Sequence, residues 1–136
     1  MEIELSVADE VLSTNKQDAS ARKAERAILE ELKLICEALP VHWALAASDR
    51  VPSLPELLRP APPAFVDLRH VFLAHGEFDA ADIQKLGQDQ AVEEWSRGWS
   101  IKSLPLFAPS SARNHQFEGQ VWRLLSRWGR FAAAQT

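Results

Sequence analysis

One short segment, residues 67–76, holds the side chains best suited to acid–base chemistry: Arg69, His70 and His75. Plotted as a helix at about 100° per residue, Arg69 and His75 flank an apolar stripe, and His70 points to the polar face with Asp67. A charged arginine at the edge of a buried stripe needs a partner. Arg69 either pairs with an acidic side chain of the same chain or faces a cavity or a second subunit.

The order of arginine, polar residue and histidine resembles the signature of the HEPN proteins. These are small all-helical proteins, many of which are metal-independent RNases of bacterial defence and toxin systems. Arg69, His70 and His75 match the three positions of that signature.

The resemblance implies a site shared by two protomers, with RNA as the substrate and no metal. His75 would take a proton from a ribose 2′-OH and return one to the leaving oxygen. Arg69 would hold the scissile phosphate in its fork of N–H donors. The residues alone leave a second interpretation open, in which Arg69 forms a structural ion pair and His75 ends a helix, where the dipole favours it.

Other catalytic chemistries lack their usual patterns. The chain has no Gly-rich phosphate loop and no Gly-x-Ser-x-Gly turn. Its single cysteine, Cys36, lies in an apolar helical stretch and is expected to be a buried small side chain. No ligand spacing such as His-x3-His links the histidines, which are His42, His70, His75 and His115. We therefore expect neither a metal nor a cofactor.

Charge is unevenly distributed along the chain. The net charge is −4, yet residues 111–136 carry four arginines against one glutamate, a net of +3. Arg123, Arg127 and Arg130 line one face of the expected last helix. This face predicts contact with a protein partner, and it is also the surface on which we expect any contact with RNA. The alternative is a solvated helix face whose arginines pair with acidic residues elsewhere in the chain.

Tryptophan is over-used, with five copies in 136 residues. Tryptophan is enriched at the energetic centres of protein interfaces. We expect Trp43 and Trp128 in the core. Trp99 and Trp122 are the candidate contact residues, and Trp95 stays unassigned.

Helical periodicity dominates the chain. The clearest stripes predict helices over residues 16–39 and after Ser110, the latter with a seam of Phe117, Val121, Leu124, Trp128 and Phe131. Weaker patterns predict helices over 41–48, 64–75 and 79–95, with 98–109 irregular. Residues 2–7 alternate like a strand, and six prolines fall between 40 and 63.

Together these features predict one all-α domain over residues 1–136, a bundle of four to five helices. Residues 1–12 are a candidate N-terminal β-arm, and 49–63 form a Pro-rich connector. No apolar run is long enough to span a membrane and no signal peptide is evident, so we expect a cytoplasmic protein. The expected function is a small non-catalytic subunit, adaptor or inhibitor acting by protein–protein contact in a bacterial-type assembly. The alternative is a HEPN-like endoribonuclease or an inactive relative, for which a homodimer is expected.

Overall fold

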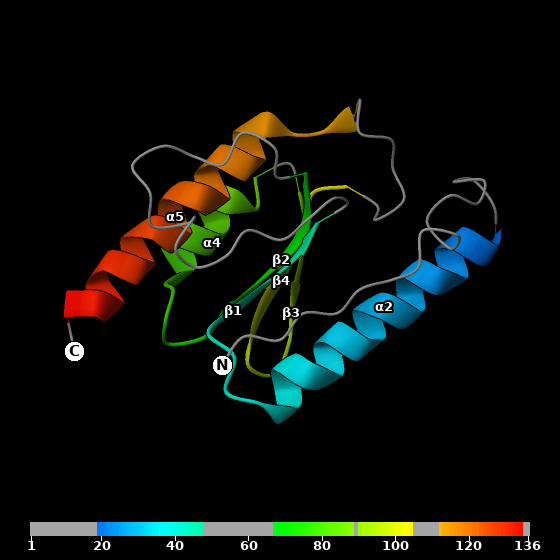
Figure 1. Cartoon of the computed structure of the whole chain (residues 1–136), viewed down its shortest axis with the longest axis horizontal. Helices are drawn as coiled ribbons and strands as arrows, with labels where there is room; N and C mark the ends of the chain where they lie inside the picture. Colours follow the sequence, from blue (N-terminus) through cyan, green and yellow to red (C-terminus); the bar gives the residue numbers. More distant parts are fainter. Residues whose placement is uncertain (1–18, 48–66, 89, 105–111, 135–136) are drawn as a thin grey trace.

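A computed structural model describes residues 19–47, 67–88, 90–104 and 112–134 of the chain. Figure 1 shows a sheet with one helix on one side and two helices on the other. The elements, in chain order, are α2 (Ala19–Ala38), β1 (Trp43–Ala47), β2 (Leu68–Ala74), α4 (Ala80–Leu86), β3 (Ala91–Glu94), β4 (Gly98–Lys102) and α5 (His115–Ala134).

The prediction of an all-α bundle is wrong, because a four-stranded antiparallel sheet forms the centre of the molecule. The strand order is β1-β2-β4-β3. In this order β2 is a central strand and β3 is at an edge. Val71 of β2 lies opposite Leu45 of β1 and Ile101 of β4, and Val92 of β3 lies opposite the same Ile101.

The strand β2 replaces the helix predicted over residues 64–75. All seven of its side chains are buried. Val71 and Leu73 belong to a core cluster that also contains side chains of α4 and α5, whereas Phe72 packs with Cys36 of α2. A strand buried on both faces shows no polar–apolar alternation, which explains why its apolar run resembles part of a buried helix.

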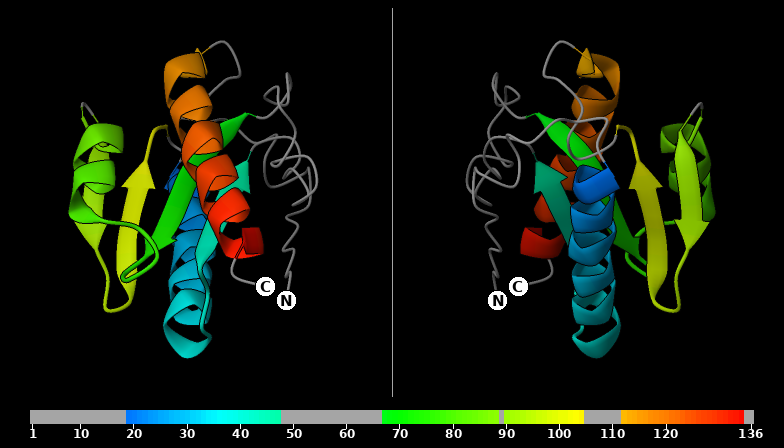
Figure 2. Two further views of the ribbon diagram at one scale, coloured as in Figure 1. Left: turned by 90° about the vertical axis from the view of Figure 1, so that its left-hand side faces the viewer. Right: turned by 90° about the vertical axis from the view of Figure 1, so that its right-hand side faces the viewer.

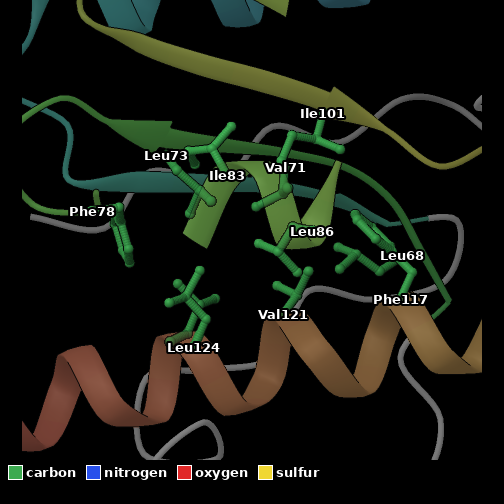
Figure 3. Packing of buried hydrophobic residues seen from close by; sticks show 11 residues of the cluster. Leu68, Val71, Leu73, Phe78, Ile83, Leu86, Ile101, Phe117, Val121 and Leu124 are labelled. Atoms are coloured by element: carbon green, nitrogen blue, oxygen red, sulfur yellow. The ribbon is translucent and has the colours of Figure 1, made fainter. Parts of the chain in front are cut away.

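The larger core lies between the sheet and the two helices α4 and α5 (Figure 3). The predicted seam of α5 is confirmed at Phe117, Val121 and Leu124, which are buried in this cluster. Trp128 is partly buried against the same cluster. The side chain of Phe131 lies outside the described residues.

The smaller core lies between the opposite face of the sheet and α2 (Figure 2). Cys36 is 1% exposed and packs there with Phe72 and Trp95. The predicted burial of Cys36 is confirmed. The two cores make the described part of the molecule a three-layer structure of helix, sheet and helices.

The remaining helix predictions are confirmed only in part. Residues 19–38 are helical as expected, but Trp43–Ala47 of the predicted segment 41–48 is strand β1. The segment 79–95 divides into helix α4 and strand β3, and Gly98–Lys102 is strand β4 rather than irregular chain. The candidate β-arm over 1–12 and the Pro-rich connector over 49–63 lie outside the described residues.

Local signals explain where α4 begins and ends. The carboxylate of Asp79 accepts a hydrogen bond from the backbone N–H of Asp82 at 2.9 Å, which caps the N-terminus of the helix. Gly87 follows the last helical residue, and its backbone N–H donates to the carbonyl of Ile83. The chain then turns into the edge strand β3.

Candidate functional site

The central candidate residue, Arg69, is held in a buried ion pair. Its Nε donates to Asp67 Oδ1 at 2.8 Å and its Nη2 to Asp67 Oδ2 at 2.7 Å. Arg69 is 0% exposed and Asp67 is 3% exposed. This bidentate geometry is the strongest form of an arginine–carboxylate contact. It is the structural ion pair that one of the two interpretations of the segment predicts.

A second arginine links the same carboxylate to the end of α5. Arg113 lies 3.9 Å from Asp67 and donates two hydrogen bonds to Glu118, at 3.1 Å and 2.7 Å. These acidic and basic side chains thus form one partly buried charge network beside Phe117. The network joins the start of β2 to the first turn of α5.

His70 lies on the α2 side of the sheet and is 3% exposed. Its Nε2 is hydrogen-bonded to the hydroxyl of Ser100 at 2.6 Å. Burial, assisted by the positive charge of Lys102, lowers the pKa of His70 to about 4. His70 is therefore neutral near pH 7 and is shielded from solvent, which favours a structural rather than a proton-transferring role.

His75, in contrast, lies at the accessible end of β2. Its side chain is 38% exposed, and its Nε2 is 3.1 Å from Glu94 Oε2. The imidazole meets the ring of Trp99 edge-on, with centroids 4.4 Å apart. A carboxylate and an indole thus fix the orientation of the ring.

Arg69 and His75 are not brought together within one chain. They are near opposite ends of the same strand, so about 20 Å separates their Cα atoms at about 3.3 Å per residue. Arg69 is enclosed at one end of the strand and His75 is open at the other. The segment that the sequence presents as one cluster is therefore two separate environments.

Sequence reasoning missed a second histidine–glutamate pair, His42 with Glu77. His42 Nδ1 is 2.9 Å from Glu77 Oε1, and the indole N–H of Trp128 donates to Glu77 Oε2 at 2.9 Å. The backbone N–H of Ala74 donates to the carbonyl of His42, which places His42 beside the end of β2. Only the antiparallel pairing of β1 with β2 brings His42 there, and the helix prediction for both segments concealed that pairing.

Every tryptophan of the chain lies at least partly inside the protein. Trp95 is 6% exposed, and the indoles of Trp43, Trp99, Trp122 and Trp128 pack partly buried against the larger core. Trp128 lies edge-on to Trp43, with ring centroids 6.2 Å apart. The Nε1 atom of Trp122 is buried and has no hydrogen-bond partner in the part of the chain that the structure describes.

The three arginines of α5 share an exposed face. Arg123, Arg127 and Arg130 all fall about 180–240° around the helix from the buried Val121. The side chain of Arg127 is 64% exposed, and its Nη2 donates to Asp82 Oδ1 of α4 at 2.8 Å. The face is therefore solvent-accessible, with one of its charges shared with α4.

The described residues offer neither a cluster of metal ligands nor a membrane-spanning helix. No group of three or more His, Cys, Asp or Glu side chains among them is arranged to hold a metal ion. None of the described helices is long and apolar enough to cross a membrane.

Comparison with known proteins identifies no relative. No protein-family model, curated protein or solved structure matches the chain.

Proposed function

We propose that the protein is a small non-catalytic interaction protein, a subunit, adaptor or inhibitor that acts by protein–protein contact within a larger bacterial-type assembly. The observation that carries this proposal is the exposed arginine face of α5. Arginine forms directed hydrogen bonds with carboxylates and is enriched at interface hot spots. The partner surface is accordingly acidic.

The state of the candidate catalytic residues supports the same proposal. The guanidinium of Arg69 is fully buried and engaged with Asp67, and the imidazole of His70 is buried and bonded to Ser100. Both side chains are held by partners inside the protein in this arrangement. Neither is exposed to a substrate.

Charge reversal on α5 tests the proposal directly. Tagged protein is cross-linked and purified from its own cells, and the recovered proteins are compared between the wild type and a double variant, Arg123→Glu with Arg130→Glu. The matched control is Arg22→Glu with Arg26→Glu, which reverses two exposed arginines on α2. We expect the α5 variant to lose its partners and the α2 variant to keep them. Equal recovery from both variants contradicts the proposal, and partners lost only on RNase treatment indicate RNA instead.

The tryptophan contacts are tested separately. If Trp99 and Trp122 contribute to the interface, Trp99→Ala and Trp122→Ala weaken partner recovery while the circular dichroism spectrum stays native. If both variants unfold, the two indoles are core residues and the interface consists of the arginine face alone.

The alternative function is a HEPN-like, metal-independent endoribonuclease, or an inactive relative, in which Arg69, His70 and His75 are the catalytic residues. The observation in its favour is His75, whose accessible imidazole is oriented by Glu94 as a general acid or base requires. The buried Arg69 weighs against it, and so does the central sheet, because the HEPN proteins are all-helical and Arg69 and His70 lie here on strand β2. Purified protein is incubated with single-stranded RNA, and His75→Ala must abolish cleavage at unchanged thermal stability. An absence of cleavage by the wild type removes the endoribonuclease and leaves only the inactive relative.

A further inference from the structure

The edge strand β3 has an accessible outer side. Within the described part of the chain β3 pairs only with β4, and all four of its side chains are exposed. Figure 2 shows β3 at the outer edge of the sheet, beyond β4. An accessible edge strand is a template on which another strand pairs, unless the protein blocks it.

The backbone groups that face outward follow from the pairing with β4. The N–H of Trp95 donates to the carbonyl of Gly98 at 2.7 Å, so this opposing pair is hydrogen-bonded. Hydrogen-bonded and non-hydrogen-bonded pairs alternate along an antiparallel ladder. Glu93 and Ala91 therefore bond inward to β4, whereas the N–H and C=O groups of Val92 and Glu94 point outward. The edge offers four backbone groups in the spacing that a further strand requires.

The side chains of β3 define which strand fits. Val92 is 44% exposed and is one of two large apolar side chains exposed in the described residues. The Glu93 side chain is 70% exposed, and its Oε1 lies 3.9 Å from Lys33 Nζ. The Glu94 side chain is 65% exposed. The edge thus combines an apolar position with two accessible carboxylates.

A second copy of the chain fits this edge poorly. Antiparallel pairing of two β3 strands that uses all outward groups sets Val92 opposite Glu94 and Glu93 opposite the same residue of the other copy. Like charges directly opposite each other destabilise a strand pair. The partner strand must instead carry positive charge.

We infer that β3 accepts an extended basic segment of a partner protein as a fifth strand of the sheet. This inference rests on the proposed function and adds the chemistry of one partner segment: lysine or arginine facing Glu93, and an apolar residue packing on Val92. Backbone hydrogen bonds from Val92 and Glu94 supply affinity, and the charged pairs select the segment.

The probe is a fluorescein-labelled peptide of alternating lysine and valine, with a glutamate–valine peptide as its counterpart, followed by anisotropy. Val92→Pro removes an outward N–H and leaves the β3–β4 hydrogen bonds intact, because Val92 is in a non-hydrogen-bonded pair. Its matched control, Val92→Thr, keeps the N–H and the branched side chain. We expect about tenfold weaker binding for V92P and about wild-type binding for V92T.

Charge is tested by Glu93→Lys against Glu31→Lys, which makes the same change on the exposed surface of α2. We expect about tenfold weaker binding of the basic peptide for E93K only, a difference that salt reduces. E93K leaves the backbone intact, so it decides the question even if V92P fails to fold. Equal weakening by E31K, or equal binding of the acidic peptide, overturns the inference. The inference is also overturned if the wild-type protein sediments as a homodimer and the V92P variant sediments as a monomer.

Partner recovery from native cells separates this inference from the proposed function. If V92P and E93K keep all partners while the α5 double variant loses them, the strand-addition inference fails and the proposed function stands. If none of the variants loses a partner, the proposed function itself fails.

Discussion

Arg69 and Asp67 form a bidentate ion pair at the start of β2, and the guanidinium is fully buried. Removing Arg69 takes two short hydrogen bonds from the buried Asp67 carboxylate and leaves Arg113 beside it at 3.9 Å, so the desolvated charge loses most of its compensation. The pair is therefore a strong requirement of the fold, whatever the surface of the protein binds.

We predict that Arg69→Ala lowers the free energy of unfolding by about 3–5 kcal/mol. The comparison is Arg127→Ala, which removes an arginine that is also 2.8 Å from a carboxylate but 64% exposed. That variant should lose less than about 1 kcal/mol, because exposed ion pairs contribute little. Urea denaturation of both variants measures the difference, and equal losses would show that burial of the Arg69 pair is not decisive.

His70 predicts a specific dependence of stability on pH. Its pKa falls from 6.5 in the unfolded chain to about 4 in the folded protein, because burial and then Lys102 disfavour the charged form. Between these values the unfolded state binds more protons, so this group's contribution is full above about pH 6.5 and is lost as the pH falls toward 4. This lowering of the His70 pKa corresponds to about 3 kcal/mol.

The measurement is the free energy of unfolding at pH 7 and pH 4.5 for the wild type and for His70→Gln, which retains a hydrogen-bonding group for Ser100. H70Q should lose much less stability between the two pH values than the wild type does. His115→Gln removes a histidine from the exposed start of α5 and serves as the control. Identical pH dependence in H70Q and H115Q contradicts the prediction.

The sequence predicted those helices that have one buried face. In α5, Phe117, Val121 and Leu124 recur at helical spacing because only that side of the helix meets the sheet. The exposed, charged face of the same helix could be predicted equally well, because Arg123 and Arg130 lie opposite the seam. For such a helix, periodicity and burial report the same geometry.

The sheet was not predicted because its central strand β2 has no exposed face. In β2 even Arg69 and His70 are buried, so no alternation of polarity marks the strand. The β-branched and aromatic pair Val71 and Phe72 was the available local signal for a strand.

The candidate site was predicted by residue type but not by arrangement. Arg69 and His75 are close in sequence, and a helix would place them about two turns apart. A strand instead separates them, with Arg69 near one end of β2 and His75 near the other. The pairs His42–Glu77 and His75–Glu94 depend on strand pairing, a contact between segments distant in sequence. Hydrophobic periodicity describes single elements and carries no information about such pairing.

Cys36 provides a test of how firmly α2 packs on the sheet. Cys36 is 1% exposed, and burial, with a smaller effect of Glu37, raises the pKa of its thiol to about 11. Because the thiolate is the reactive form, we predict very slow labelling by a disulfide reagent at pH 8 and rapid labelling in urea. Fast, complete labelling of the native protein would show that α2 opens readily from the sheet.

Two glycines should respond to the same substitution with opposite signs. A Cβ at Gly98 would collide with the backbone oxygen of Leu73 and approach the ring of Phe72 to 2.7 Å, so Gly98→Ala forces β4 away from β2. We expect a loss of about 1–3 kcal/mol, the usual range for overpacking. Gly119 is inside α5, and a Cβ there would meet only the end of Arg123 at 3.9 Å. Gly119→Ala should therefore raise stability by about 0.5–1 kcal/mol through helix propensity. Thermal and urea unfolding of the two single variants check both signs, and a stabilising Gly98→Ala would contradict the close approach of β2 and β4 at this position.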